Sequence, residues 1–394
     1  MNDLRELSLS LSALGVFSGL LDRPLFRRFL EVTGESTGAT ARVRAYGAMM
    51  GEVYAGGGNL AAAVRRAVFE DENPYVRMRA GKGVCDKAVQ DAVRTELEIL
   101  SRLASLTPAD FEAVLSAAPY LPPFTAETVD LVAEYEARML EIHQHGYGIF
   151  ASNAMFRIAD GADAVIEPIG SPDTVTLDCF VGYEEERGRV LENTKAFLAG
   201  RPAANVLLYG DAGTGKSSTV KAVVNHLFDK GLRLIEIRKD QLSRLPHVMA
   251  QIRNNPLRFI VFIDDLSFNQ SDDSFSMLKA ALEGSAAAKS PNAVIYATSN
   301  RRHIVRETFS ERAGDELHRN DTVQETLSLS ERFGLTILFA RPDKKLYLEI
   351  VRELAEKYRI TMDTAELERQ AEAFALSRST RSARCAEQFI ESLM

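Results

Sequence analysis

One short stretch limits the fold of this chain more than any other. Residues 210–217 read Gly-Asp-Ala-Gly-Thr-Gly-Lys-Ser, which is the pattern G-x-x-x-x-G-K-S. The apolar residues 206–209 come before it and read as a buried strand, and residues 217–228 after it are compatible with a helix. A phosphate-binding loop needs strand, glycine-rich loop and helix in this order. The sequence therefore predicts such a loop here.

The residue types of the loop suit phosphate chemistry. Gly213 and Gly215 let the backbone curl, so that several N–H groups point inward at one phosphate. The helix that starts near Lys216 adds its positive N-terminal end. We expect Lys216 to reach the β- and γ-phosphates and the Ser217 hydroxyl to bind Mg²⁺. A chance glycine-rich turn before a helix would not require Lys and Ser in this register.

We expect the whole loop to contact the nucleotide. The predicted phosphate-binding residues are Gly210, Asp211, Ala212, Gly213, Thr214, Gly215, Lys216, Ser217 and Ser218.

A second signal follows the third predicted strand, residues 259–263. That strand ends in Asp264 and Asp265. Mg²⁺ takes oxygen ligands and keeps several waters, so we expect Asp264 to hold the metal through water and Asp265 to polarise the attacking water. Two adjacent acids could also form a solvated turn. Downstream of a phosphate-binding loop, the metal-site interpretation is favoured.

The fourth predicted strand, residues 293–298, is followed by Asn300. A polar side chain at the carboxyl end of this strand lies beside the γ-phosphate in this kind of sheet. An amide can hydrogen-bond both a phosphate oxygen and a water molecule. The alternative is a turn-forming Asn, which is common.

Composition limits the class of protein. The chain has 394 residues, which is too many for one core, and 46% of them are hydrophobic. The net charge of −8 argues against a protein that binds nucleic acid over its whole surface, although it is compatible with a local basic groove. No apolar run is long enough to span a bilayer, the N-terminus has no basic signal-peptide region, and three well-separated cysteines suit reduced thiols. These features predict a cytoplasmic protein.

The hydrophobic pattern predicts three domains. Residues 1–175 are mainly helical, with a hairpin at 147–169. In residues 176–340, continuous apolar strands alternate with helical segments, which is typical of an α/β domain with a mostly parallel sheet covered on both faces. Residues 341–394 form three short helices.

The sequence of residues 176–394 resembles the AAA+ P-loop ATPases. In detail it is similar to a bacterial family of ATP-binding proteins of unknown function, the domain of unknown function 815 (DUF815). The resemblance is carried by residues 193–194, 205–211, 213–221, 231–236, 259–268, 297–303 and 327–334. The loop and the acidic strand end, which correspond to Walker A and Walker B, are specific to P-loop NTPases. The Leu-Ser-Phe after Asp265 and the Asn-Arg-Arg-His run from Asn300 are specific to the smaller family.

The resemblance implies further roles. ATP and Mg²⁺ would be the ligands, Asn300 would be sensor 1, and Arg332 would be the arginine finger. Arg384 matches the sensor 2 position, with Arg381 as the alternative. The segment Val181-Gly182-Tyr183 would bind adenine. The last three helices would form a lid, and the active form would be a homo-oligomer such as a hexameric ring.

The sequence departs from the AAA+ pattern at one catalytic position. The second acid of the Walker B strand is usually Glu, and here it is Asp265. Its carboxylate reaches about one methylene less far, so we expect hydrolysis of ATP to ADP and phosphate to be slow or relayed through a second water.

These observations leave three functions to compare. The first is a Mg-ATP-dependent AAA+ ATPase that remodels an unknown protein client. The second is a nucleic-acid-associated AAA+ loader or initiator, which the basic residues 301–303 and Arg312 would serve. The third is a nucleotide-gated binding module with little turnover, for which the shorter Asp265 is the argument.

Overall fold

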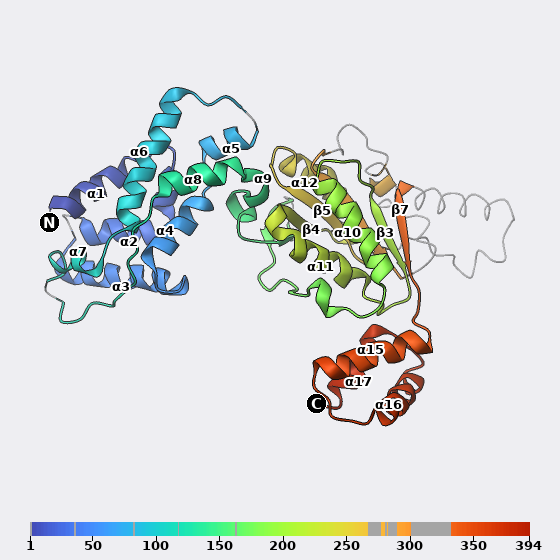
Figure 1. Cartoon of the computed structure of the whole chain (residues 1–394). Helices are drawn as coiled ribbons and strands as arrows, with labels where there is room; N and C mark the ends of the chain where they lie inside the picture. The colour runs from blue at the N-terminus through green and yellow to red at the C-terminus, as the bar shows by residue number, and fades with distance from the viewer. Residues whose placement is uncertain are drawn as a thin grey trace. The chain divides into compact units, whose positions relative to one another are not determined.

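The computed structural model describes residues 2–34, 37–81, 83–116, 118–161, 164–266, 277–279, 282, 290–300 and 332–394. It divides into two compact units (Figure 1). The first, here called the helical unit, comprises Met1–Ser152 and Asn254–Pro256. The second, here called the sheet unit, comprises Asn153–Arg253 and Leu257–Met394.

The helical unit is built from amphipathic helices. They are α1 (Asn2–Ser12), α2 (Pro24–Thr33), α3 (Ala39–Ala55), α4 (Leu60–Phe69), α5 (Pro74–Ala80), α6 (Lys87–Ala104), α7 (Pro108–Glu112), α8 (Leu131–Leu140) and α9 (Ile142–His145). Side-chain oxygens of Asn59, Asn73 and Asp86 accept hydrogen bonds from the first turns of α4, α5 and α6, so polar caps set where these helices begin. Apolar residues at helical spacing, such as Leu4, Leu7 and Leu11 of α1, are buried in one core.

The sheet unit contains a seven-stranded sheet in the order β2-β1-β4-β5-β6-β3-β7. The strands are β1 (Met155–Ile158), β2 (Ile166–Pro168), β3 (Val206–Gly210), β4 (Leu232–Glu236), β5 (Arg258–Ile263), β6 (Ala293–Ser299) and β7 (Leu335–Phe339). All neighbouring pairs are parallel except β1 and β2. The predicted α/β class and parallel sheet are confirmed. Because β3 lies between β6 and β7, its carboxyl end opens beside the ends of both neighbours.

The hairpin predicted at residues 147–169 is present as the antiparallel pair of β1 and β2, but these strands lie in the sheet unit. The hydrophobic pattern assigns it to a helical domain that ends at residue 175, whereas the structure places the boundary between Ser152 and Asn153. The strand β1 pairs in parallel with β4, with Phe156 opposite Ile235. A two-stranded hairpin is marginally stable by itself, and this pairing adds a ladder and buries Met155 and Phe156 almost completely.

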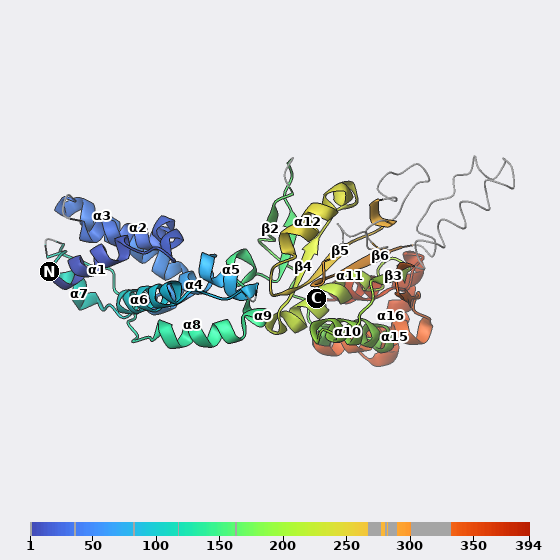
Figure 2. The ribbon, with the colours of Figure 1, turned by 90° about the horizontal axis from the view of Figure 1, so that it is seen from above.

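Helices cover both faces of the sheet (Figure 2). The helices α10 (Glu184–Leu198) and α11 (Lys216–Leu227) lie on one face and α12 (Leu245–Ile252) on the other. Val190 of α10 and Val220 of α11 share a core with Leu208, Leu234 and other strand residues. Burial from both sides explains why these strands are continuously apolar.

Three C-terminal helices form the predicted lid. They are α15 (Lys344–Lys357), α16 (Thr364–Ser377) and α17 (Ala383–Glu391), and they have their own core around Tyr347, Ala371 and Phe389. With the strand order of the sheet, they complete the predicted P-loop NTPase fold of the AAA+ type, preceded by a mainly helical region.

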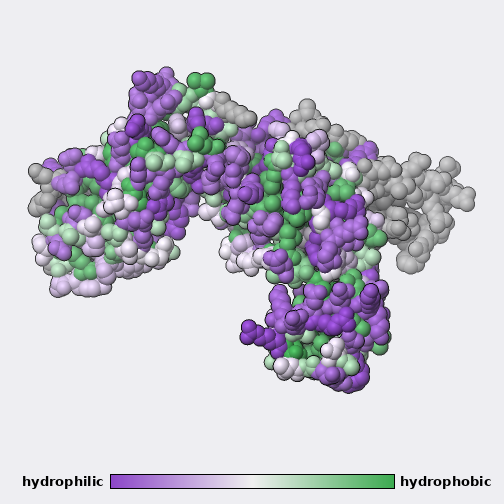
Figure 3. Space-filling view, in the orientation of Figure 1, coloured by the Kyte–Doolittle hydropathy of each residue, from purple (hydrophilic) through white to green (hydrophobic). Residues whose placement is uncertain are grey.

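The visible surface mixes hydrophilic and apolar side chains over both units (Figure 3). None of the helices in the described ranges combines the length and the hydrophobicity that a membrane-spanning segment needs.

Candidate nucleotide-binding site

The glycine-rich loop lies between the carboxyl end of β3 and the N-terminus of α11. Gly213 and Gly215 have positive φ angles of 75° and 84°, which residues with a Cβ atom adopt only with strain. At Gly210 a Cβ atom would lie 2.1 Å from the carbonyl oxygen of Phe339, so the close approach of β7 also requires glycine there. Residues 212–218 line a pocket of about 330 Å³.

Lys216 is a buried cation of this pocket, at the start of α11. It is 5% exposed, and its Nζ donates hydrogen bonds to the carbonyl oxygens of Gly210 and Asp211 at 3.2 and 2.6 Å. Burial lowers the pKa of Lys216, and the nearby acids Asp211, Asp264 and Asp265 act in the opposite direction. The acids therefore favour the charged form that binding of a phosphate requires.

Two hydroxyl groups converge on one carboxylate oxygen at the carboxyl ends of β5 and β6. The Oγ of Ser217 donates to Oδ1 of Asp264 at 2.6 Å, and the Oγ1 of Thr298 donates to the same oxygen at 2.5 Å. Among the described residues, no group of three or more His, Cys, Asp or Glu side chains could hold a metal ion. One carboxylate with one hydroxyl fits Mg²⁺, which completes its coordination with waters and nucleotide phosphates.

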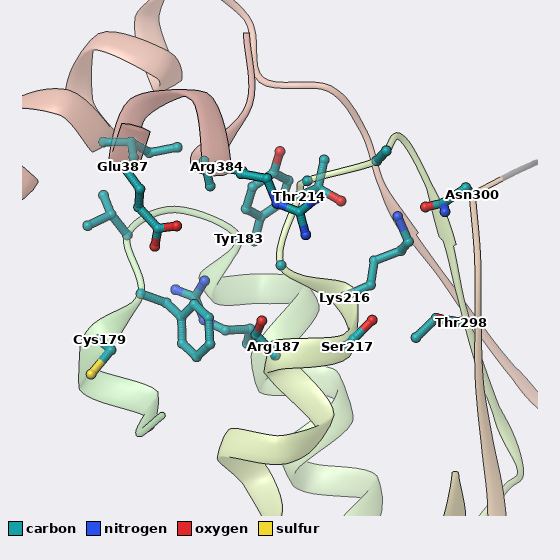
Figure 4. Close-up of a pocket in the computed structure, with 18 of the residues that line it drawn as sticks. Cys179, Tyr183, Arg187, Thr214, Lys216, Ser217, Thr298, Asn300, Arg384 and Glu387 are labelled. Carbon is teal, nitrogen blue, oxygen red and sulfur yellow. The ribbon is translucent and has the colours of Figure 1, made fainter. Parts of the chain in front are cut away.

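Asp265 and Asn300 meet at the same edge of the sheet (Figure 4 labels Asn300, Thr298, Ser217 and Lys216). The Nδ2 of Asn300 donates to Oδ1 of Asp265 at 2.8 Å. The backbone N–H of Asp265, whose φ is 50°, donates to Oγ1 of Thr298 at 2.9 Å. Asp tolerates this left-handed conformation better than most residues. Thr298 thus contacts both acids of the Walker B pair.

The other end of the pocket is lined from the segment before α10 and from the lid. Val181 lines it, whereas Gly182 does not. Gly182 has a φ of 72°, and a Cβ there would lie 2.7 Å from Cδ1 of Leu346. The hydroxyl of Tyr183 donates to the carbonyl oxygen of Ala340 at 2.6 Å. This segment is therefore held against the connection between β7 and the lid.

The two candidate sensor 2 arginines have different surroundings. Arg384, at the start of α17, lines the pocket, and its backbone N–H donates to the carbonyl oxygen of Gly213 at 3.4 Å. Arg381 donates from Nε and Nη2 to the two carboxylate oxygens of Glu372 at 3.0 and 2.9 Å. The geometry favours Arg384, and its contact with phosphate stays a prediction.

Some predicted site residues lie outside the pocket lining. Gly210 and Asp211 contribute carbonyl oxygens to Lys216, and the carboxylate of Asp211 accepts from the backbone N–H of Arg341 at 3.1 Å. Arg332, which is half-buried, does not line the pocket either, so its role as an arginine finger stays a prediction. Residues 301–303 and Arg312, on which the nucleic-acid alternative depends, lie outside the described residues.

The pocket also contains residues that the sequence analysis missed. They are Cys179, Phe180, Arg187, Thr298, Ile350, Leu354, Ala383 and Glu387. Thr298 lies two residues before Asn300 at the carboxyl end of β6, and the alternation of side chains in a strand would have singled it out. The lid residues have no such local signal, because only the folded chain brings them to the loop.

Comparison with known proteins places the chain in a family. A model described as "Protein of unknown function (DUF815)" matches residues 151–394, which is more than half of the chain. The chain belongs to the DUF815 family. The match begins next to the structural boundary at Asn153, so the DUF815 region and the sheet unit nearly coincide. No curated protein matches the chain.

Solved structures with detectable likeness include a Holliday junction branch migration motor, RuvB, of Thermotoga maritima. The two sequences are 14% identical, and the match covers 55% of this chain and 71% of the RuvB chain, with a TM-score of 0.34. A variant of the same RuvB is 17% identical over the same shares, with a TM-score of 0.35. Scores of this size carry no argument, so the fold assignment rests on the topology of this chain's own sheet and lid.

Proposed function

We propose that this DUF815 protein binds Mg-ATP and hydrolyses it. The observation that carries the proposal is one pocket in which the glycine-rich loop, Lys216, the Ser217–Asp264 pair and the Asp265–Asn300 pair face each other. These are the parts that phosphoryl transfer to water requires: a phosphate cradle, a cation, metal ligands and a group that orients water.

Each side chain has a distinct task in this proposal. Lys216 binds the phosphate oxygens, and Ser217 and Asp264 would hold Mg²⁺, which neutralises phosphate charge when it is bound. Asn300 donates to Oδ1 of Asp265, and this bond orients the carboxylate. Among the described residues, no hydrogen bond involves Oδ2 of Asp265, so we assign that oxygen to the attacking water.

The test compares the two acids of the Walker B pair. We expect Asp265→Asn to keep ATP affinity within about twofold while multiple-turnover phosphate release falls about 100-fold, because general-base assistance contributes that much. Asp264→Asn should also lose the dependence of ATP affinity on Mg²⁺. The matched control is Asp229→Asn, because Asp229 is an exposed acid of the sheet unit that does not line the pocket.

The outcome of this test also separates the two kinds of function. Wild-type turnover in Asp265→Asn would remove Asp265 from the mechanism. Tight ATP binding without turnover in the wild-type chain would favour the nucleotide-gated binding module. For that module, the short reach of Asp265 is the supporting feature.

We further propose that the active form is a homo-oligomer in which Arg332 acts on the neighbour's γ-phosphate. An arginine in that role accelerates phosphoryl transfer by about 10³-fold or more. Arg332→Ala and Lys216→Ala should each be inactive, and mixing them should restore activity because one subunit supplies Arg332 and the other Lys216. A monomer in light scattering with concentration-independent turnover would contradict this proposal. Remodelling of a protein client and a cytosolic location rest on the sequence alone and stay predictions.

A further inference from the structure

Glu387 is an acidic residue of the lid that faces the nucleotide pocket. It lies on α17, three residues after Arg384, and both residues line the pocket. Figure 4 shows its carboxylate directed from α17 into the pocket, on the side of Cys179 and Arg187 and away from Lys216 and Asn300. It therefore lies at the end of the pocket opposite the predicted γ-phosphate position.

This carboxylate has no structural partner among the residues that the structure describes. No hydrogen bond or ion pair to Glu387 is found there. Burial and the negative charge of Glu391 raise the pKa of Glu387, and the nearby Arg384 and Lys357 act in the opposite direction. Glu372, a carboxylate on another lid helix, is by contrast held by Arg381 and Lys344. Glu387 thus offers free acceptor oxygens to a ligand in the pocket.

The position of Glu387 along the pocket indicates which part of a nucleotide it meets. The backbone contact between Arg384 and Gly213 places the start of α17 against the phosphate-binding loop. Glu387 lies about one helical turn further along α17, and Figure 4 shows its carboxylate on the far side of the pocket from Lys216. The apolar side chains of Val181, Ile350 and Leu354 also line the pocket and suit the flat faces of a base.

A carboxylate is a suitable partner for the ribose, which lies between the phosphates and the base of a nucleotide. The ribose carries two neighbouring hydroxyl donors, and acidic side chains accept from ribose hydroxyls in dinucleotide-binding sheets. We propose that Glu387 accepts hydrogen bonds from the ribose hydroxyls of the bound nucleotide and thereby selects ribonucleotides over 2′-deoxyribonucleotides. This inference rests on the proposed ATP site and assigns its sugar specificity.

The experiment measures the affinity of the full chain for ATP and for 2′-deoxy-ATP by calorimetry with Mg²⁺. The wild-type chain should prefer ATP about tenfold, as expected for one hydrogen bond to a charged acceptor. Glu387→Ala should bind the two nucleotides equally. Glu387→Gln, which keeps an uncharged acceptor, should show an intermediate preference.

Two controls separate the hydrogen bond from a general effect of charge. Glu353→Gln removes an exposed acid of the lid helix α15 that does not line the pocket, and it should keep the wild-type preference. Inorganic tripolyphosphate has no sugar, so Glu387→Ala should not weaken its binding. Circular dichroism checks that each variant is folded.

The outcomes distinguish the inference from the function on which it rests. Equal wild-type affinity for ATP and 2′-deoxy-ATP would overturn the role of Glu387 and leave the ATP site in place. A preference that survives in a folded Glu387→Ala chain would do the same. Failure of the wild-type chain to bind either nucleotide would overturn both the proposed function and this inference.

Discussion

Both units of this protein bury charged side chains, and Glu96 of the helical unit and Lys216 of the sheet unit have different surroundings. In the helical unit, the carboxylate of Glu96 accepts hydrogen bonds from the backbone N–H groups of Gly15, Val16 and Phe17 at 2.8, 3.1 and 2.9 Å. In the sheet unit, the ammonium of Lys216 lies in a pocket lined by further polar side chains.

The difference teaches how to separate structural from functional buried charge. Glu96 is satisfied by the loop that it holds, and three N–H groups are enough to stabilise a buried carboxylate. Lys216 has two carbonyl partners and shares its cavity with Asp264, Asp265 and Asn300. Polar side chains that line a cavity together indicate a ligand site. A buried charge whose hydrogen bonds are all to backbone groups indicates a role in stability.

The largest expected effect concerns the boundary between the units. A fragment of residues 153–394 keeps β1 and β2 and should fold, whereas a fragment of residues 176–394 loses both strands and should aggregate. The reason is that β4 then presents an unpaired edge of apolar sequence. Solubility and circular dichroism of the two fragments provide the measurement. Equal stability of both fragments would show that the hairpin is dispensable to the sheet unit.

The second prediction tests the structural role of Glu96. Glu96→Ala leaves three N–H groups without their acceptor and should lower the free energy of unfolding by about 3–5 kcal/mol, with ATP affinity unchanged. Glu96→Gln keeps one acceptor oxygen and should cost less. Glu98→Ala, an exposed acid of the same helix, should be nearly neutral. Denaturant unfolding measures all three, and a neutral Glu96→Ala would refute the structural role.

The third prediction tests the role of Lys216 in nucleotide binding. Lys216→Ala should weaken ATP binding about 100-fold, because it removes the buried cation expected on the β- and γ-phosphates. The helical content should stay unchanged. Lys230→Ala, an exposed lysine just beyond the same helix, is the control. Calorimetry that finds wild-type affinity in Lys216→Ala would remove the loop from nucleotide binding.

The smallest expected effect compares cysteines of the two units. Cys85 in the helical unit and Cys385 in the lid core are buried, whereas Cys179 is half-buried and lines the pocket. A hydrogen bond with Thr176 lowers the pKa of the Cys179 thiol. Iodoacetamide should therefore modify Cys179 first, and Mg-ATP should slow this about tenfold by covering it. Mass spectrometry locates the label, and labelling unaffected by ATP would place the nucleotide elsewhere.

Features that are formed by residues adjacent in the chain could be predicted from the sequence. The strand, loop and helix around Gly210, Lys216 and Ser217 are adjacent in the chain, so their chemistry and their order predict a phosphate-binding loop without knowledge of distant contacts. The apolar runs likewise predicted the parallel sheet, and the resemblance predicted the lid.

Features that depend on distant pairs were decided by the tertiary structure alone. The parallel pairing of β1 with β4 moved the domain boundary, because a short hairpin pattern does not say which edge it joins. The choice between Arg384 and Arg381 depends on Glu372, which holds one of them away from the pocket. Thr298 and Glu387 reach the site only when β6 lies beside β5 and α17 begins against Gly213. The physical reason is that side-chain proximity across strands and between core and lid follows from packing, which local sequence does not encode.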